Sequence, residues 1–355
     1  MRDFFSGLKV VELASVLAGP AVGTFFAELG ATVTKVENKL TGGDVTRGWR
    51  VQGEPTEGMS AYYSSVNYGK ECLMVDLTNE DDRTKIDALV KDADMVVSNY
   101  LSRVAQKFGL NYESIREKNP TVIYLDLVGY ENESRPAYDA ILQAETGWIS
   151  MTGTDAENPA KLPVALIDVL AGHQLKEAAL LALLHREKTE EGSYSRCSLE
   201  ASSLSALANQ ASNYLMVDKV AKPMGTAHPN IAPYGDCFKS KDETKFVLAV
   251  GSEKHFQELA SVFEAKHLME KPEYSSNSLR VENRAVLIND LSKVFEQLYF
   301  EEIESKMRNK GIPFGEVKSL DKVLADQTAT KMILEETQEG TMTRRLSSIA
   351  FKTSF

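Results

Sequence analysis

The stretch Leu8–Glu37, LKVVELASVLAGPAVGTFFAELGATVTKVE, decides the fold. It opens with alternating, β-branched residues up to Leu13, which is the pattern of a strand. A short loop to Pro20 follows, and the apolar residues 21–29 with a glycine directly after them predict a helix and its end. Residues 31–37 alternate again. The stretch therefore predicts a strand, a helix and a second, parallel strand, which together make one βαβ unit.

Further strands and helices repeat this alternation downstream. Residues 73–77 predict a strand, and Thr78–Asp81 supply a helix cap with acidic first-turn residues. Met95–Val97 and Val122–Leu125 are short apolar runs of the kind that form buried parallel strands. Strands that alternate with helices predict an α/β fold, here a large Rossmann-like domain with a parallel sheet and helices on its faces.

The chain changes character after Pro223, where a proline-interrupted segment follows a helix-rich region. We expect a large domain over 1–220, a smaller α+β domain over 221–325, and a C-terminal segment, 326–355, that returns to the large domain. The remaining predicted elements are helices at 169–185, 201–216, 256–263, 284–309 and 320–325, and strands at 194–199, 245–251, 315–317 and within 344–355, the last folding back onto the large domain.

The composition is that of a globular protein. The 355 residues, 43% hydrophobic and 26% charged, are enough to bury a large core in two domains. The formal charge of −11 argues against a nucleic-acid partner, because neutralising phosphates needs clustered Lys and Arg. The N-terminus has neither a long apolar stretch nor a small-residue cleavage site. We therefore expect a cytoplasmic protein that has no membrane partner.

The cysteines and the short catalytic motifs exclude several classes of site. Cys72, Cys197 and Cys237 are odd in number, far apart and without CxxC spacing, so we expect buried thiols and neither disulfides nor zinc ligands. The motifs HExxH and GxSxG, a Walker loop and a Cys/His cluster are all absent. Metalloenzyme, serine hydrolase and NTPase functions therefore lack the residues that they require, and no metal site is expected.

The loop Ser15–Pro20 is the first candidate for chemistry. It lies between a strand and a helix, where backbone amides at the helix N-terminus face an anionic ligand. Glu37, about 20 residues further on, imitates the ribose-binding acid of dinucleotide folds. The glycine fingerprint is missing, however, because Gly19 stands alone and Pro20 has no amide proton. NAD binding is therefore weakly supported, and an ordinary tight turn at a helix start explains the loop equally well.

Asp168 is the second candidate, because it stands where an apolar segment enters a predicted helix. A carboxylate at that place most often caps the helix by accepting hydrogen bonds from amides two and three residues on. The same amides would keep the carboxylate ionised and hence nucleophilic at neutral pH, so the two interpretations are compatible. Tyr138–Asp139 on its own predicts only a loop and a helix start, and His173 and His228 are interpreted as structural.

An ordered series of motifs runs through nearly the whole chain. It begins with Gly7–Leu13 and Leu17–Pro20. The later members are Leu29–Ala31, Lys35–Glu37, Gly43–Trp49, Asn67–Lys70, Asp94–Tyr100, Phe108–Leu110, Asn119–Pro120, Gly129–Tyr130, Tyr138–Asp139, Gly192, Ala227–Tyr234 and Gly311–Pro313. Taken in order, the series closely resembles the family III CoA-transferases, a group that includes formyl-CoA and carnitine CoA-transferases and the α-methylacyl-CoA racemases.

The resemblance implies a CoA-transferase in which Asp168 attacks the thioester of a donor acyl-CoA to form a mixed anhydride. The thiolate would return to give an aspartyl-CoA thioester, from which an acceptor acid takes over the CoA through a second anhydride. The implied partners are an acyl-CoA and a small carboxylic acid, with coenzyme A as substrate and no metal. A homodimer of interlocked rings is also implied. CoA contacts carry over to Val16, Leu17, Ala18, Asn38, Lys39, Leu73, Asn99, Tyr100 and Lys107, and catalytic roles to Asp168, Tyr138 and Asp139.

Three places depart from the pattern of these relatives. Leu17 stands where formyl-CoA transferases have a glutamine, so the oxalate and formate specificity of that branch is not expected to carry over. Asn38–Lys39 replace arginines that hold the adenine and phosphate end of CoA. Tyr138 stands where racemases have a histidine base, and a tyrosine with a pKa of about 10 is a poor base at pH 7. A transferase is therefore preferred over an α-methylacyl-CoA racemase or epimerase that uses Asp168 and Asp139, and over a non-catalytic CoA-binding dimer.

Overall fold

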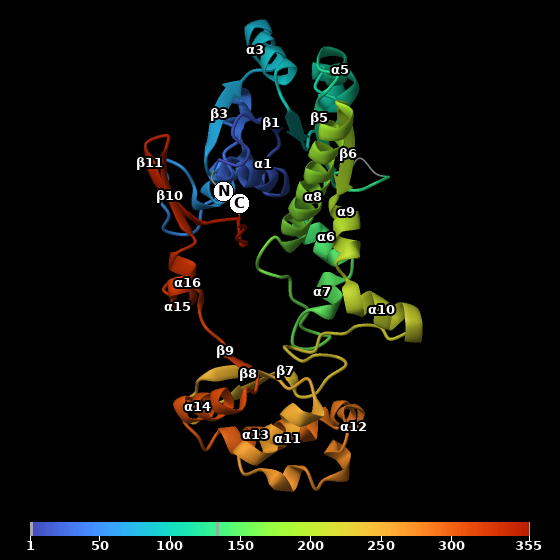
Figure 1. Ribbon diagram of the computed structural model, residues 1–355, viewed down its shortest axis with the longest axis vertical. Helices are drawn as coiled ribbons and strands as arrows, with labels where there is room; N and C mark the ends of the chain where they lie inside the picture. The colour runs from blue at the N-terminus through green and yellow to red at the C-terminus, as the bar shows by residue number, and fades with distance from the viewer. Residues whose placement is uncertain (1–2, 133–134, 355) are drawn as a thin grey trace. The chain divides into compact units, whose positions relative to one another are not determined.

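The computed structural model describes residues 3–132 and 135–354 (Figure 1). The chain divides into two compact units. The segment 148–161, which the sequence analysis placed in the large domain, belongs to the second unit. The first unit comprises the residues up to 147, residues 162–219 and the residues from 327 on, and the second unit comprises 148–161 and 220–326.

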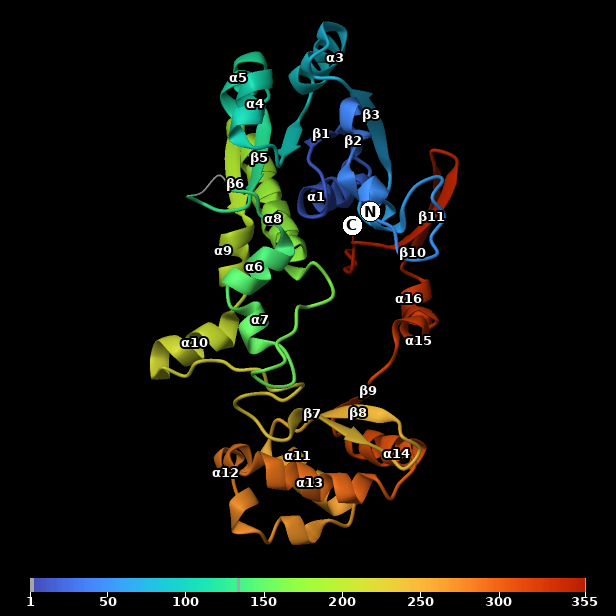
Figure 2. The ribbon, with the colours of Figure 1, turned by 180° about the vertical axis from the view of Figure 1, so that it is seen from behind.

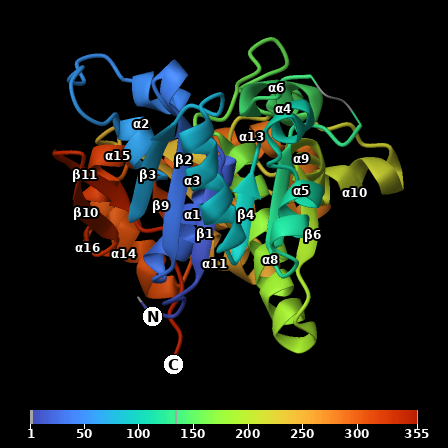
Figure 3. The same ribbon diagram turned by 90° about the horizontal axis from the view of Figure 1, so that it is seen from above.

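A six-stranded sheet with only parallel neighbours forms the centre of the first unit (Figure 3). The strand order is β3-β2-β1-β4-β5-β6, so the chain reverses direction across the sheet between β1 and β4. In open α/β sheets, ligands bind outside the carboxyl ends of the strands at such a switch point. The predicted parallel α/β sheet is confirmed. Its strands are β1 (Lys9–Leu13), β2 (Thr32–Asn38), β3 (Lys70–Val75), β4 (Met95–Ser98), β5 (Ile123–Val128) and β6 (Ser193–Ser198).

Three helices cover one face of this sheet. They are α3 (Glu80–Lys91), α4 (Ser102–Phe108) and α5 (Tyr112–Lys118). The start of α3 is as predicted, because Asn79 accepts a hydrogen bond from the N–H of Asp82 and acidic residues fill the first turn. The core on this face is made by Ile86, Val90 and Ile115 from the helices and Val11, Val96 and Tyr124 from the strands.

The other face is covered by α1 (Ala18–Glu28) and α8 (Leu166–Thr189), which pack against each other. α1 lies close to β1 because two of its positions are glycine. A Cβ on Gly19 would lie 2.5 Å from the Cβ of Ala14, and one on Gly23 would lie 2.0 Å from Glu12 Oε2. Neither approach leaves room for a side chain. α8 is longer than predicted and begins three residues earlier, which changes the place of Asp168 in it.

The C-terminal part of the first unit forms a hairpin, with β10 (Ile333–Gln338) antiparallel to β11 (Thr341–Leu346), beside β3 (Figure 2). The amide of Gln338 donates to the carbonyl oxygens of Asn67 and Lys70, at 3.2 and 3.1 Å. The two strands make a sheet of their own. The predicted strand within 344–355 is therefore wrong in its bounds, and Phe355 lies outside the described residues.

One predicted helix of the first unit is interrupted. The pattern over 201–216 predicts a single helix, but Ala208 has a φ of +46°, which lies outside the right-handed helical region, so one continuous helix cannot pass through this residue. Two helices, α9 and α10, result. The remaining helices of this unit are α2 (Ala61–Ser64), α6 (Asp139–Glu145), α9 (Leu199–Ser205), α10 (Ala208–Val217) and α16 (Gln327–Thr330), with the 3₁₀ turns η1 (Lys39–Thr41) and η2 (Val45–Gly48).

The second unit is a small antiparallel sheet with helices, as the prediction of a smaller α+β part requires. Its core contains the rings of Phe238, Phe246 and Phe295, which contact one another. The elements are β7 (Tyr234–Lys239), β8 (Lys245–Ala249), β9 (Phe314–Glu316), α7 (Trp148–Met151), α11 (Glu253–Val262), α12 (Asn277–Glu282), α13 (Arg284–Phe295), α14 (Phe300–Lys310), α15 (Leu320–Leu324), η3 (Lys266–Leu268) and η4 (Pro272–Tyr274).

The structure tests the prediction that the three cysteines are buried thiols. Cys72, Cys197 and Cys237 are free thiols. The first two are half-buried, but Cys237 is exposed, because it points outward from the edge strand β7, so the prediction of buried thiols is wrong there.

Over the described residues, each helix is too short or too polar to cross a membrane.

Candidate active site

The loop between β1 and α1 has a strained backbone that hydrogen bonds stabilise. Val16 has a φ of +73°, a left-handed conformation that is costly for a β-branched residue. Its N–H donates to the two carboxylate oxygens of Asp44, at 3.2 and 3.4 Å. The N–H of Ser15 donates to Asn99 Oδ1 at 3.1 Å, and its carbonyl accepts from Asn99 Nδ2 at 2.9 Å. The loops after β1 and β4 are thus joined at the switch point of the sheet.

The first turn of α1 follows this loop directly. α1 begins at Ala18, three residues earlier than predicted, and Leu17 is its N-cap residue. Leucine has no polar side chain, so it satisfies none of the helix's first N–H groups. Pro20 lies in the first turn, where a missing N–H costs no helical hydrogen bond. The turn therefore presents backbone amides at the positive end of a helix, as binding of an anionic ligand requires.

Gly172 of α8 allows α1 and α8 to come close at this end of the sheet. A Cβ on Gly172 would lie 3.1 Å from the carbonyl oxygen of Ala18 and 3.5 Å from the Cβ of Ala21. Asp168 precedes Gly172 by four residues and lies on the same side of the helix. The N-terminus of α1 therefore lies next to the turn of α8 that carries Asp168.

Asp168 is a buried carboxylate in the first turn of α8, with 8% of its surface exposed. Its interpretation as the cap of this helix is wrong, because α8 begins at Leu166 and its N-cap residue is Ala165. The pKa of Asp168 is raised to about 7, first by burial and second by the negative charge of Asp139. The expectation that capping amides keep Asp168 ionised is therefore also wrong. Burial and the charge of Asp139 therefore favour the protonated form of Asp168.

Asp139, and not Asp168, accepts hydrogen bonds at the start of α8. One of its oxygens accepts from the N–H of Ile167 at 2.7 Å, and the other from Gln143 Nε2 at 2.6 Å. Gln143 is fully buried and accepts from the N–H of Leu162 at 2.9 Å. Because Asp139 opens α6, these bonds hold the N-termini of α6 and α8 together. Tyr138, the N-cap residue of α6, is 56% exposed.

Tyr62 is a residue of this site that the sequence analysis missed. The pKa of its phenol is raised by partial burial and then by the charges of Asp168, Asp139 and Asp44, so these three carboxylates act electrostatically on it. The ring of Trp49 meets the ring of Tyr62 edge-on, with 5.0 Å between the ring centres. The residues around Tyr62 carry no signal of this role, because it arises from segments that are far apart in the sequence.

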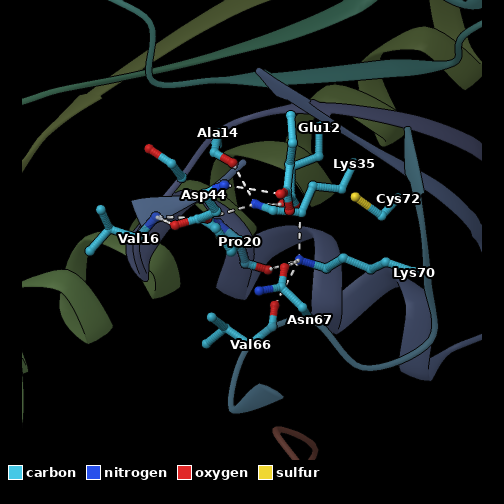
Figure 4. A network of polar contacts seen from close by, with 12 residues as sticks. Glu12, Ala14, Val16, Pro20, Lys35, Asp44, Val66, Asn67, Lys70 and Cys72 are labelled. Atoms are coloured by element: carbon cyan, nitrogen blue, oxygen red, sulfur yellow. Dashed lines mark hydrogen bonds and ion pairs between the residues drawn. The ribbon is translucent and has the colours of Figure 1, made fainter. Parts of the chain in front are cut away.

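Four charged side chains form a buried network next to the loop (Figure 4). Lys35 Nζ lies 3.0 Å from Glu12 Oε1 and 3.0 Å from Asp44 Oδ2, and Lys70 Nζ lies 2.7 Å from Glu12 Oε2. Each of the four side chains is at most 1% exposed. Two positive and two negative charges compensate one another. This network was not predicted, although charged residues inside otherwise apolar strands, such as Glu12 and Lys35, are the sequence signal that could have indicated it.

The structure contradicts the interpretation of Glu37 as the ribose-binding acid of a dinucleotide fold. Glu37 accepts from Arg47 Nε and from the hydroxyl of Tyr63, both at 2.6 Å, and from the N–H of Asp44 at 2.9 Å. Its carboxylate is 3% exposed and saturated with protein donors, so it cannot bind a ribose. Over residues 3–132 and 135–354, no group of three or more His, Cys, Asp or Glu side chains could hold a metal ion.

Most of the other predicted CoA contacts lie at the carboxyl ends of the strands. Asn38–Lys39 are exposed at the end of β2, and Asn99–Tyr100 directly follow β4. Lys107 is exposed on α4, the helix that comes after β4. These residues share one edge of the sheet with the loop of residues 16–18.

Leu73 does not belong to this group. It lies in the middle of β3 and lines a cavity of about 570 Å³ beside α3. Lys9 and Thr32, the first residues of β1 and β2, line the same cavity. The cavity therefore lies toward the amino ends of the strands, on the side away from the loop of residues 16–18.

Comparisons with known proteins agree on one family. The family model described as "CoA-transferase family III" matches residues 5–354. The chain is 32% identical over 348 residues to the succinate–glutarate CoA-transferase of Agrobacterium fabrum, a match that covers 95% of this chain and 86% of that protein. It is 35% identical over 329 residues to the succinyl-CoA:glutarate CoA-transferase of Homo sapiens, a match that covers 90% of this chain and 73% of that protein. A solved structure of a CAIB/BAIF family protein from Brucella suis matches with a TM-score of 0.84 and 33% identity, over 99% of this chain and 92% of that one.

Proposed function

The chain belongs to CoA-transferase family III, and on that premise we propose that it moves coenzyme A from succinyl-CoA to a dicarboxylic acid such as glutarate through covalent intermediates on Asp168. The observation that supports Asp168 as the nucleophile is its position in the fold. It is a buried carboxylate one helical turn from the point where the N-terminus of α1 packs against α8. The choice of acids follows the two relatives, which are named for succinate, succinyl-CoA and glutarate.

The reaction needs four acyl-transfer steps and no net proton. The carboxylate of Asp168 attacks the thioester carbonyl of the donor, which forms a mixed anhydride and releases CoA thiolate. The thiolate attacks the aspartyl carbonyl, which forms the aspartyl-CoA thioester and releases the donor acid. The acceptor carboxylate then attacks that thioester, and a second anhydride forms as the thiolate leaves. The thiolate finally attacks the acceptor carbonyl, giving the new acyl-CoA and free Asp168.

Burial of Asp168 serves this chemistry in two ways. Exclusion of water protects the anhydrides and the thioester from hydrolysis, which would dissipate the energy that the transfer conserves. A carboxylate whose pKa is raised to about 7 is also a stronger nucleophile, when ionised, than an exposed one.

Asp139 is better suited to position Asp168 than to transfer protons. Both of its oxygens accept hydrogen bonds from protein groups, namely the N–H of Ile167 and the amide of Gln143. A racemase would need a second free base next to the substrate, but both oxygens of Asp139 are already bound to protein donors. These contacts favour transfer over racemisation.

Coenzyme A is assigned to the carboxyl edge of the sheet. The amides of residues 17 and 18 offer hydrogen bonds at the positive end of α1, and the exposed Lys39 and Lys107 offer charge to the phosphates. Asn99 acts on the backbone of Ser15. We leave Leu73 out of the proposed contacts, because it lies in the middle of its strand.

An assay with succinyl-CoA and a panel of dicarboxylic acids tests the proposed function. We expect glutaryl-CoA or a close homologue to appear by mass spectrometry, and no deuterium to enter the α-carbon of an acyl-CoA in D₂O. Deuterium wash-in without an acceptor acid would show a racemase instead. Tight CoA binding without turnover across the panel would show a non-catalytic protein.

A homodimer is part of the proposal. α10 exposes Leu215, Met216 and Val217 by 80%, 82% and 71%, and α8 exposes Leu181 by 68%. Apolar side chains exposed together mark interaction surfaces, and we assign these to a second copy of the chain. We expect light scattering to give twice the mass of one chain, and the double variant Leu215→Glu, Met216→Glu to weaken the association. A wild-type protein of single-chain mass would refute the dimer. The cytoplasmic location stays a prediction.

A further inference from the structure

The buried network of Glu12, Lys35, Asp44 and Lys70 contacts the loop between β1 and α1 at three successive places (Figure 4). Lys35 Nζ donates to the carbonyl oxygen of Ala14 at 2.6 Å. Asp44 accepts from the N–H of Val16. Lys70 Nζ donates to the carbonyl oxygen of Pro20 at 2.8 Å. The network therefore holds the start and the middle of the loop and the first turn of α1.

Buried ion pairs add little net stability, because the cost of removing charges from water offsets most of their attraction. A buried network whose polar groups are all paired mainly restricts the residues around it to one conformation. Here that conformation is the left-handed backbone of Val16, with its φ of +73°. Such strain persists only where surrounding contacts over-determine it, and Asp44 makes the contact with the strained residue itself.

Asp44 is itself held in place from two sides. Its Oδ1 accepts from the N–H of Thr46 at 3.0 Å and from the Thr46 hydroxyl at 2.8 Å. Its Oδ2 lies 3.0 Å from Lys35 Nζ. The side chain is fully buried, so it does not touch a ligand in solvent. Its direct hydrogen bonds to the loop between β1 and α1 are those from the backbone N–H of Val16.

We propose that Asp44 is a positioning residue for coenzyme A, which binds the N–H of Val16 and so holds the loop in the one arrangement that presents the amides of residues 17 and 18 to acyl-CoA. This inference rests on the proposed function, in which that loop binds CoA. It assigns a role in affinity to a side chain that lies beneath the site. It also gives a role to the strained backbone of Val16, which Asp44 holds.

The variant Asp44→Asn tests the proposal, because it keeps the shape of the side chain and removes its charge. We expect the Kd of CoA, measured by calorimetry, and the KM of succinyl-CoA to rise about 10- to 100-fold, as loss of a charge-assisted hydrogen bond predicts. We expect kcat to stay within about threefold, because Asp168 is unchanged. A folded Asp44→Asn with unchanged Kd and KM would overturn the proposal, and so would a fall in kcat at constant KM.

Two further variants make the test robust. Thr46→Val keeps every charge and removes only the hydroxyl that donates to Asp44, so it is expected to fold and to raise the Kd about 2- to 5-fold. If Asp44→Asn does not fold, an unchanged Kd in Thr46→Val refutes the proposal instead. Asp92→Asn is the matched control, since Asp92 forms an exposed ion pair with Lys9, and its Kd should equal that of the wild type.

Failure of the proposed function would be separately visible. The Kd of CoA needs no turnover, so it measures the role of Asp44 even if no acid is found to accept CoA. A wild-type protein that binds CoA but transfers it to none of the acids contradicts the proposed function alone. A wild-type protein that does not bind CoA contradicts both.

Discussion

Asp168→Asn is expected to lower the kcat of CoA transfer at least about a thousandfold. The amide has the shape of the carboxylate but cannot attack a thioester, so the first anhydride does not form. The measurement is steady-state transfer with succinyl-CoA and the best acceptor acid. In the wild type, hydroxylamine added during turnover should convert the acylated carboxyl group to a hydroxamate, which peptide mass spectrometry locates at position 168. The Asn variant should show no such adduct.

Asp126→Asn is the matched control for this substitution. Asp126 is also an aspartate whose pKa is raised by burial, but it lies on β5 and accepts a hydrogen bond from Tyr194. Its replacement should leave kcat within about threefold. Transfer by Asp168→Asn at more than about a tenth of the wild-type rate would contradict the covalent mechanism.

The loss of activity should not reflect unfolding, because Asp168→Asn is expected to be more stable than the wild type. The pKa of Asp168 is about 7 in the folded chain against an ordinary 3.8, so the folded state binds more protons between these values. The free energy of unfolding of the wild type therefore loses a contribution as the pH rises from about 4 to about 7. The uncharged amide of the variant has no such loss. The variant should be no more stable than the wild type below pH 4, and its free energy of unfolding should exceed that of the wild type by about 1–4 kcal/mol above pH 7.

Glu12→Gln is expected to lower the free energy of unfolding by about 3–5 kcal/mol. Glu12 pairs with both lysines of the buried network, at 3.0 Å from Lys35 and 2.7 Å from Lys70. Without its charge, Lys35 keeps only Asp44, and Lys70 keeps no carboxylate among the partners described above. Burial already lowers the pKa of Lys70 to about 8 while Glu12 opposes the shift, so the substitution should drive Lys70 toward its neutral form. Urea unfolding followed by circular dichroism measures the effect.

Two variants identify the cause of this destabilisation. Glu335→Gln removes an exposed carboxylate that pairs with Arg344, and it should change stability by less than about 0.5 kcal/mol. The double variant Glu12→Gln, Lys70→Met also removes the unpaired cation, so it should be less destabilised than the sum of the single variants. Additive effects, or a Glu12→Gln as stable as the wild type, would show that the network contributes no such energy.

Much of the scaffold follows from local patterns. The alternation in Leu8–Glu37 predicts the first βαβ unit, and the structure has it at β1, α1 and β2. Asn79 with three acidic residues after it predicts the start of α3, because a cap and its amides lie within one turn. The predicted start of α8 is wrong, since residue 165 has no polar side chain to mark it, and the N–H of Ile167 donates to Asp139, which is distant in sequence.

The amino-acid sequence was sufficient to predict a parallel α/β fold and membership of CoA-transferase family III, and its resemblance to that family is the source of the proposal that Asp168 is the nucleophile. Periodicity, caps and ordered motifs are local, so they can be recognised before the chain is folded. The folded structure was needed to see that Asp139 accepts the hydrogen bonds at the start of α8, that burial raises the pKa of Asp168, and that Asp44 holds Val16. These properties depend on burial and on charges from distant segments, which exist only once the sheet and its helices have assembled.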